Sequence, residues 1–244
     1  MRISKSQTEK NRRLVIQTAV DLMTAQGFDG TTMKQIARAA ELGDATIYNY
    51  FPSKEKLVLA YFEQAAADAL ADMAKTPGLA SFTLQERMQL LIDALLERFL
   101  ADREFVALAH KLVAGAPLLL MGDNLPGKTL LSHAFAEMLA QAESKGEIAP
   151  CGFKPSLAAL LADGVYAITA YWLRDDSEEF GNTTQMVDLS LGLLVLTLHS
   201  GVINKALELG GFMLRSQLSR LLRDGHGLLD LLKLARMGLG GVGK

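Results

Sequence analysis

Residues 31–51 decide the fold of this chain, and they read TTMKQIARAAELGDATIYNYF. Small and apolar side chains recur here at the spacing that two short, crossed helices need. The small Ala37 lets the helices approach closely, Leu42 fills the turn, and Ile47 directs the second helix's inner face to the core. The stretch therefore predicts a helix-turn-helix, whose second helix enters the major groove of DNA. The residues that set the pattern are Ile36, Ala37, Ala40, Leu42 and Ile47.

Both helices have recognisable ends. The first is expected from about Met33 to Ala40, with Thr31 or Thr32 as its N-cap, because a hydroxyl can accept a hydrogen bond from the first free amides. The second is expected from about Asp44 to Tyr50. Pro52 ends it, because the residue before a proline avoids the helical region.

A helix is expected on each side of this motif. The earlier one ends at Gly27, and the later one begins after the cap Ser53 and reaches about Lys75. The earlier helix carries an apolar stripe made of Leu14, Val15, Ala19, Leu22 and Met23.

The rest of the chain shows helical periodicity, and no run of alternating β-branched residues suggests a strand. The fold class is therefore all-α. Pro155 suits the first turn of a helix, and Thr183 can cap another. The expected helices cover about 83–101, 103–114, 128–145, 155–174 and 183–209, and residues 210–244 hold two weaker helices before a flexible, glycine-rich tail.

The outer face of the second motif helix carries short polar or planar groups that can reach base edges and phosphates. Asparagine can pair bidentately with adenine, and a tyrosine hydroxyl can bond a phosphate. These residues are Asp44, Ala45, Thr46, Tyr48 and Asn49.

The motif resembles the TetR family of bacterial regulators over about residues 9–70. The body is similar to the family only in length, helicity and helix order. The resemblance implies a three-helix DNA-binding domain over residues 1–53 (recognition motif 32–51), a ligand-binding and dimerisation domain over 54–209, and an extension over 210–244. It rests on Gly27–Phe28, Thr31–Thr32, Ile36–Ala37 and Thr46–Glu55.

The resemblance also implies roles for single residues toward double-stranded DNA. Some should meet phosphates or groove edges, some should open the recognition helix, and Tyr50 and Lys54 should hold the DNA backbone. A lysine at a helix start suits phosphate, since free amides point there. The complete set is Thr32, Lys34, Asp44, Ala45, Thr46, Tyr48, Asn49, Tyr50 and Lys54.

Two positions depart from the family pattern. The turn reads Glu41-Leu42-Gly43, so Glu41 stands where glycine is usual and Gly43 replaces a good cap. Asp44 brings a negative charge to the start of the recognition helix. That charge favours the helix dipole and can accept from a cytosine amine, but it repels phosphate. The operator sequence stays open.

One recognition helix contacts few bases, so a homodimer on a palindromic operator is expected, with half-sites about 34–36 Å apart or a multiple of this. By resemblance, two apolar helices of the body form a four-helix interface with the second copy. The alternative is that both are core helices of a monomer. The predicted interface residues are Leu157, Leu161, Val165, Ile168, Val187, Leu191, Leu194 and Leu198.

The helices between about residues 83 and 172 should surround a ligand cavity. A mostly apolar lining with few polar groups suits a small apolar or amphipathic effector. By resemblance, binding alters helix packing, and the fourth helix carries the change to the DNA-binding end. The alternative is that these side chains are plain core. The candidates are Phe99, Phe105, His110, His133, Phe135, Tyr166 and Trp172.

Composition and charge limit the other classes. Residues 1–56 carry nine Lys or Arg and six acids, and the whole chain has a net charge of −2, so the basic end sits on an acidic body. The polar start is unlike a secretory signal. The longest apolar stretch, 189–203, is shorter than the roughly 20 residues of a membrane span. A lone Cys151 allows no internal disulfide. We expect a cytoplasmic protein with no membrane partner.

Residues 122–129 fit the phosphate-loop pattern G-x-x-x-x-G-K-[ST]. A true phosphate loop follows a strand of a parallel sheet, which the sequence does not predict, and Pro126 removes one amide that would hold phosphate. We interpret the segment as a loop between helices, with Asn124 as a cap. No catalytic constellation, metal site or cofactor is expected. A helical scaffold without DNA binding remains the alternative class, and repression and activation both stay open.

Overall fold

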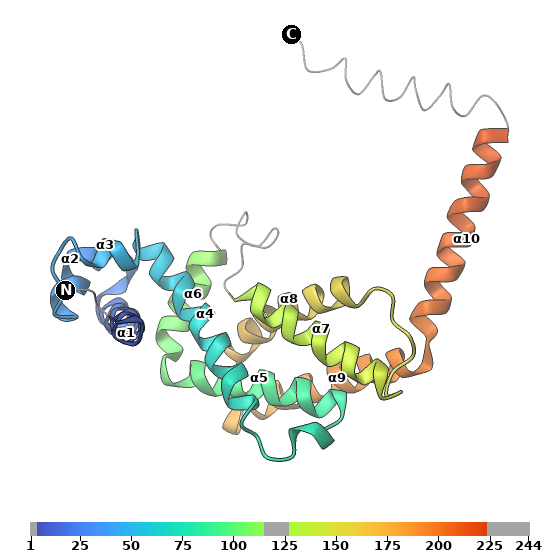
Figure 1. Cartoon of the computed structure of the whole chain (residues 1–244), viewed down its shortest axis with the longest axis horizontal. Helices are drawn as coiled ribbons and strands as arrows, with labels where there is room; N and C mark the ends of the chain where they lie inside the picture. Colours follow the sequence, from blue (N-terminus) through green and yellow to red (C-terminus); the bar gives the residue numbers. More distant parts are fainter. Residues whose placement is uncertain (1–3, 115–126, 224–244) are drawn as a thin grey trace, which may run out of the picture.

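The computed structural model describes residues 4–114 and 127–223, and these ranges contain helices and no strand. The all-α prediction is confirmed. Helices α1–α3 form one end of the molecule, α4 runs from them into a bundle of α5–α9, and α10 projects away from that bundle (Figure 1). The helices are α1 (Lys5–Gly30), α2 (Met33–Ala39), α3 (Ile47–Tyr50), α4 (Lys54–Met73), α5 (Leu84–Ala101), α6 (Arg103–Ala114), α7 (Lys128–Ser144), α8 (Lys154–Trp172), α9 (Gly181–Ser200) and α10 (Val202–Arg223).

Helix α1 begins at the cap Ser4 and is interrupted where the sequence predicted its end, at Gly27, whose φ is +79°. One residue of the predicted stripe lies elsewhere, since Leu14 is 50% exposed. Its neighbour Ile16 is buried instead, because a helix period of 3.6 places residues 15, 16, 19, 20 and 23 on one face. The buried face is Val15, Ile16, Ala19, Val20 and Met23.

Thr32 caps helix α2 and forms a capping box with Gln35. It is one of the two residues that the sequence predicted as the cap. Helix α3 is shorter than predicted. Residues 44–46 form a turn, closed by a 2.8 Å hydrogen bond from the Thr46 amide to the Gly43 carbonyl, and the helix begins only at Ile47. Gly43 has no side chain to cap an earlier start, which explains the difference.

Helix α4 connects the two ends of the molecule. It starts at the predicted cap Ser53 and ends at Met73, two residues before the predicted end. Its first turns bury Leu57 and Val58, and its later turns bury Tyr61 and Phe62. One continuous helix therefore packs against both α1 of the N-terminal unit and α5 and α7 of the bundle.

Side chains distant in sequence fix the ends of the bundle helices. Arg87 on α5 is 3% exposed and pairs with Glu147 at 3.2 Å. The Arg103 guanidinium donates to the carbonyls of Trp172, Leu173 and Asp175, which closes the C-terminal end of α8.

The predicted single helix over 183–209 is wrong. Gly201 has φ +68° and ends α9, and α10 starts at the next residue in a new direction. Thr183 is also no N-cap, since it lies buried in the first turn of α9 and its amide donates 2.8 Å to Asp175.

Helix α10 extends to Arg223, so residues 210–223 belong to one helix instead of the start of two. The predicted glycine-rich tail and the Asn124 cap lie outside the described residues.

Within the part of the chain that the structure describes, no single helix has the length and apolar character to cross a bilayer. The bent pair of residues 178–200 and 202–213 meets the criteria only when its two halves are joined, with 64° between them.

Candidate DNA-binding surface and effector cavity

The N-terminal unit has a closed core beneath the predicted recognition surface. Ile36, Ala37 and Ile47 are fully buried, and Ala40 is 2% exposed. Leu42 is partly buried and packs against them. The spacing argument is confirmed for these residues, so the turn and α3 are held by packing.

The predicted contact residues of the turn and α3 point away from this core. Asp44, Ala45 and Asn49 are exposed, Tyr48 is 55% exposed, and Thr46 is half-buried. A tyrosine more than half exposed beside an exposed asparagine gives hydrogen-bonding groups that can reach bases or phosphates. The surface has the chemistry of a DNA contact.

Two predicted residues on α2 already have partners within the chain. The Thr32 hydroxyl accepts from the Gln35 amide at 3.2 Å and donates to the Gln35 carbonyl oxygen Oε1 at 2.8 Å. The Lys34 ammonium lies 3.3 Å from the Asp44 carboxylate, and both side chains are about half exposed. Lys34 can therefore turn toward a phosphate without leaving a buried site.

Tyr50 and Lys54 also serve the N-terminal unit itself. The Tyr50 hydroxyl accepts a 3.0 Å hydrogen bond from the Asn11 amide group on α1. The Lys54 ammonium donates to the Phe28 carbonyl at 2.5 Å and lies 4.3 Å from the centre of the Phe28 ring. These bonds place α1 against α3 and α4.

Sequence reasoning missed Asn11 and its neighbour Arg12. The Arg12 guanidinium lies 5.2 Å from the centre of the Phe51 ring, just after α3. Both are polar residues of α1, and nothing in the local sequence pattern indicates that they contact residues far along the chain.

The turn between α2 and α3 carries the departure noted in the sequence. Glu41 has φ +55°, a left-handed conformation that favours glycine. A glycine would adopt this conformation without strain, and this chain adopts it with a glutamate.

A cavity of about 70 Å³ lies among α4, α5, α6, α7 and α8. Three predicted ligand residues line it, namely Phe99, His110 and Tyr166. Sequence reasoning missed the contribution of α4 and most of α6, because apolar stripes do not reveal which side chains meet at a void. The other lining residues are Phe62, Ala66, Leu95, Val106, Ala109, Val113, Leu131, Val165 and Thr169.

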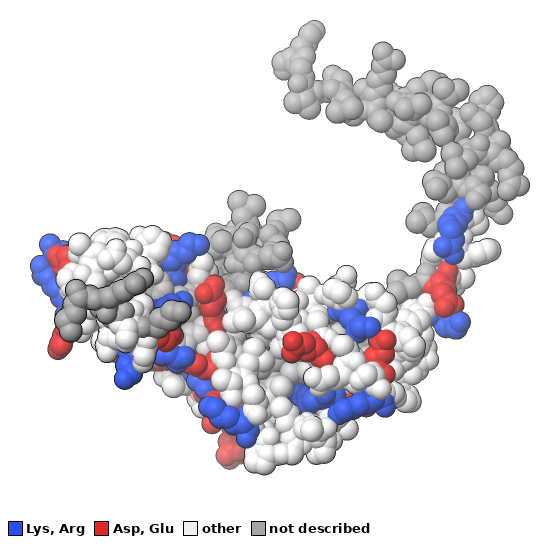
Figure 2. Space-filling model, in the orientation of Figure 1, with Lys and Arg blue, Asp and Glu red and all other residues white. Residues whose placement is uncertain are grey.

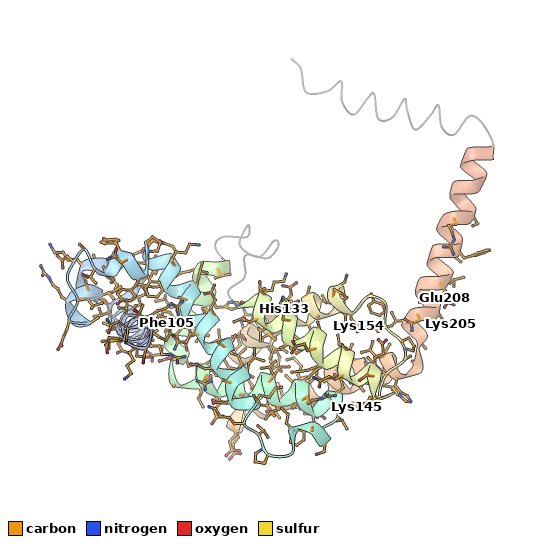
Figure 3. All side chains as sticks on the ribbon, viewed as in Figure 1. Phe105, His133, Lys145, Lys154, Lys205 and Glu208 are labelled. Atoms are coloured by element: carbon orange, nitrogen blue, oxygen red, sulfur yellow. The ribbon has the colours of Figure 1, made fainter. Side chains whose placement is uncertain are left out.

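The other four predicted ligand residues lie away from the cavity. Phe105 is buried near α1, with its ring 4.9 Å from that of Tyr61, and His133 is exposed on α7 (Figure 3). Phe135 is buried in the core. Trp172 packs against Phe180 at 5.5 Å and under Arg103. Phe105, Phe135 and Trp172 therefore have packing roles, and His133 faces outward.

Three polar residues, His110, Tyr166 and Thr169, line this otherwise apolar cavity, and the Thr169 hydroxyl already donates to the Val165 carbonyl at 2.8 Å. Burial, followed by the nearby Arg174 charge, lowers the pKa of the His110 imidazole, so the ring is neutral near pH 7. Burial, followed by the Asp163 and Glu63 charges, raises the pKa of the Tyr166 hydroxyl. A neutral imidazole and a protonated phenol both form hydrogen bonds without demanding a charged ligand.

The two ends of the molecule meet through polar contacts. Arg13 on α1 makes two hydrogen bonds of 2.9 and 2.8 Å to the Asp68 carboxylate on α4. Arg98 on α5 lies 3.7 Å from the same carboxylate. Since α1, α4 and α5 share one carboxylate, their relative positions are linked.

Five of the eight predicted interface residues are buried within the single chain: Leu157, Val165, Val187, Leu191 and Leu198. The remaining three, Leu161, Ile168 and Leu194, are partly buried. Other residues form the outward faces of α8 and α9, because both helices are apolar around most of their girth and periodicity alone did not separate the faces. Exposed there are Leu160 (66%), Tyr171 (43%), Leu189 (64%), Leu193 (66%) and Leu196 (65%).

The lysine of the phosphate-loop pattern forms an ion pair within the chain. The Lys128 ammonium is buried and lies 2.9 Å from the Asp163 carboxylate on α8. Residues 122–126 lie outside the described ranges, and Gly127, with φ +71°, packs against α4. A lysine that joins α7 to α8 has a structural role.

Cys151 is buried in the loop before α8. Among the described residues, no group of three or more His, Cys, Asp or Glu side chains can hold a metal ion.

An exposed helix-turn-helix face joined by α4 to a helical body with an internal cavity defines a DNA-binding regulator. Family models support this class. One described as "Bacterial regulatory proteins, tetR family" matches residues 15–61, and one described as "Tetracyclin repressor-like, C-terminal domain" matches residues 87–213. The chain belongs to the TetR family of transcriptional regulators. The members of this family are not enzymes; they bind DNA, dimerise and bind small-molecule effectors.

Individual relatives agree. The HTH-type transcriptional regulator RutR of Escherichia coli K12 is 30% identical over 186 residues, which cover 71% of this chain and 84% of the relative. The HTH-type transcriptional repressor NicS of Pseudomonas putida is 34% identical over 79 residues, covering 30% of this chain and 37% of the relative.

Solved structures confirm the fold. A putative TetR-family regulator from Syntrophomonas wolfei aligns with a TM-score of 0.59 and 19% identity, over 78% of this chain and 97% of that one. The regulator FadR from Bacillus subtilis, solved with stearoyl-CoA, aligns with a TM-score of 0.51 and 21% identity, over 78% of this chain and 98% of that one.

Proposed function

We propose that this regulator is a repressor, released from a palindromic operator by a small, mostly hydrophobic effector. One observation carries the proposal: α4 both lines the apolar cavity, through Phe62 and Ala66, and continues from the helix-turn-helix. An effector that spreads the cavity displaces the helix on which the DNA-binding unit is mounted. We place the boundary between the two domains at Ser53, where α4 begins.

The DNA contact is proposed for the exposed face of the turn and α3, assisted by Lys34. A cation that meets phosphate releases counterions, so its loss lowers the salt dependence of binding. Lys34→Ala should weaken retention of all duplexes and reduce the salt slope of the dimer by about two, one for each copy of Lys34. Lys75→Ala is the matched control, since Lys75 is also exposed and paired with a nearby aspartate, but lies at the far end of α4. If the salt dependence of DNA binding is equal in both variants and wild type, Lys34 does not contact DNA.

The dimer surface is proposed on the outward faces of α8 and α9. Leu189, Leu193 and Leu196 follow each other by four and three residues and form one stripe. Leu160 and Tyr171 bound a second stripe on α8, with the small Gly164 and Ala167 between them. Gly164 has open space where a side chain would stand, so a second copy can approach closely there.

Sedimentation of Leu193→Glu tests this surface. A charge in the centre of an apolar seam should convert dimers to monomers. Leu130→Glu is the control, because Leu130 is also an exposed leucine but belongs to α7, which contributes to neither stripe. A dimer that survives Leu193→Glu and Leu160→Glu at micromolar concentration would place the interface elsewhere.

The effector is proposed to be amphipathic, with an apolar body and one polar group held by His110 and Tyr166. The cavity of about 70 Å³ is well below the roughly 300–1,000 Å³ of ligand pockets, so binding must move the surrounding helices apart. The likeness to FadR concerns the fold alone, yet that protein was solved with stearoyl-CoA, and so the fold can admit a long apolar chain.

A titration of amphipathic compounds against the protein–operator complex tests the switch. The proposal expects at least one to release the operator, and His110→Phe to weaken that response by about tenfold, since a hydrogen bond worth about 1–1.5 kcal/mol is lost. His133→Phe is the control, because His133 is exposed on α7. Release that is insensitive to His110→Phe and Tyr166→Phe would exclude this polar anchor. A reporter gene downstream of the operator separates repression from activation.

A further inference from the structure

The recognition surface contains a carboxylate that is poorly suited to a general phosphate contact. Asp44 is the first residue of the turn that leads into α3, and its side chain is 48% exposed. Acidic and basic side chains are interspersed on this end of the molecule (Figure 2). A carboxylate that approaches the DNA backbone is repelled, so Asp44 must gain from another partner or weaken binding.

Base edges in the major groove offer such a partner. Guanine presents acceptors only, and thymine presents an acceptor and a methyl group. Adenine presents an amine, but its N7 acceptor lies beside that amine and repels a carboxylate. Cytosine presents its N4 amine with no adjacent acceptor. A carboxylate in the groove therefore discriminates in favour of cytosine.

Lys34 gives this carboxylate a fixed place and a compensating charge. Its ammonium lies 3.3 Å from the Asp44 carboxylate and comes from α2, the helix that precedes the turn. The ammonium has capacity for further hydrogen bonds, because it offers three donors. It can contact a phosphate while it remains beside Asp44, so the pair as a whole carries no net charge into the groove.

We propose that Asp44 determines operator specificity by accepting a hydrogen bond from a cytosine N4 amine, with Lys34 as its positioning residue. In a symmetric dimer the preference falls on a C·G pair at the same position of each half-site. The inference rests on the proposed function, since it requires the turn and α3 to enter the major groove.

Selection of bound sequences from a random duplex library, followed by affinity measurements on single-base variants, tests the proposal with the full-length protein. Wild type should prefer cytosine at one position of each half-site by at least about fivefold, the lower limit for a specific base contact. Asp44→Ala should lose the preference at that position alone. Asp44→Asn should change the preference to adenine, because an amide pairs bidentately with adenine.

Glu41→Gln is the control for the loss of a negative charge near the DNA. Glu41 is an exposed acid in the preceding turn, so this substitution removes the same charge near the DNA but should leave the base preference unchanged. Lys34→Ala should weaken the cytosine preference and reduce the salt slope, and Lys34→Arg should restore both. A merely structural lysine would not affect the salt slope.

Failure of the inference can be distinguished from failure of the proposed function. If wild type selects an operator and Asp44→Ala keeps the same preference at every position, the inference is overturned and the proposed function stands. If wild type selects no sequence and binds duplexes without salt dependence, both are overturned. Circular dichroism of each variant verifies that the helical fold is intact.

Discussion

The Tyr61 hydroxyl on α4 donates a 3.0 Å hydrogen bond to the Asp102 carboxylate, at the junction between α5 and α6. The other oxygen of Asp102 accepts from Gln17 on α1, at 3.4 Å. The next residue on α4, Phe62, lines the cavity, and its ring lies 5.3 Å from that of Tyr61. Adjacent residues of one helix thus face the cavity and the contact with the DNA-binding end.

Tyr61→Phe tests this junction. Burial and the neighbouring Asp102 charge raise the pKa of the Tyr61 hydroxyl, which keeps it protonated as a donor. Removal of the hydroxyl should lower the free energy of unfolding by about 0.5–1.5 kcal/mol. It should also change operator affinity severalfold, although Tyr61 is 7% exposed and lies outside the proposed DNA surface.

Urea denaturation and operator binding are the two measurements. Ser144→Ala is the control, because it also removes a hydroxyl but Ser144 is exposed at the end of α7, outside this junction. Operator affinity that is identical in wild type and Tyr61→Phe would show that the junction does not set the position of the DNA-binding end.

Gly127→Ala should destabilise the fold through the contact between α7 and α4. The φ of Gly127 is +71°, and an added Cβ would lie 3.2 Å from both the Ala66 Cβ and the Phe62 carbonyl oxygen. Strain and overpacking together predict a loss of about 1–3 kcal/mol. Thermal unfolding measures it, with Gly152→Ala as the control, because the space around Gly152 is open. Equal midpoints for the two variants would contradict the contact.

Local signals in the sequence predicted the helix ends well. Thr32 and Ser53 each cap the helix that follows them, because a hydroxyl and the amides that it accepts from lie within one turn. Pro155 lies in the first turn of α8 for the same local reason. The motif also predicted which of its residues are buried and which are exposed, since these positions alternate with the helix period.

Features that depend on distant contacts were not predictable. The sequence favoured Thr183 as the cap of α9, whereas the N-cap position is Phe180 and the Asp175 carboxylate from the preceding loop accepts from the Thr183 amide in the first turn. The helices α8 and α9 have two apolar faces, and only packing shows that Val187 turns inward and Leu189 outward. The cavity likewise depends on where five helices leave a void, which no single stripe encodes.

Glu41→Gly should stabilise the DNA-binding end. A non-glycine residue in the left-handed region costs about 1–2 kcal/mol, part of which is offset by the greater freedom of glycine in the unfolded chain. The expected net gain is about 0.5–1 kcal/mol, measured by thermal unfolding. Glu55→Gly, at a helical position in the first turn of α4, should destabilise instead. A loss of stability in Glu41→Gly would show that the side chain contributes more than its backbone strain costs.

Acid sensitivity is expected at the start of α9. The Asp175 carboxylate accepts from the Ser177 hydroxyl at 2.6 Å and amide at 3.0 Å, and from the Thr183 hydroxyl at 2.6 Å and amide at 2.8 Å. The Ser177 and Thr183 bonds lower the pKa of Asp175 below its ordinary value. A carboxyl with a lower pKa in the folded state stabilises the fold above its unfolded pKa, near 3.9, and this stabilisation is lost as pH falls through the folded pKa.

Asp175→Asn should therefore unfold at a lower temperature than wild type at pH 7. The difference should shrink as the pH falls below about 4, where the Asp175 carboxyl of the unfolded wild-type chain takes up a proton while that of the folded chain stays ionised. Asp176→Asn is the matched control, because Asp176 is exposed and next in sequence. It should differ little from wild type at pH 7. Melting curves of the three proteins between pH 7 and pH 3 give the comparison. A gap between wild type and Asp175→Asn that stays constant over this range would mean that the ionised carboxylate does not stabilise α9, and that neutral hydrogen bonds to Thr183 suffice.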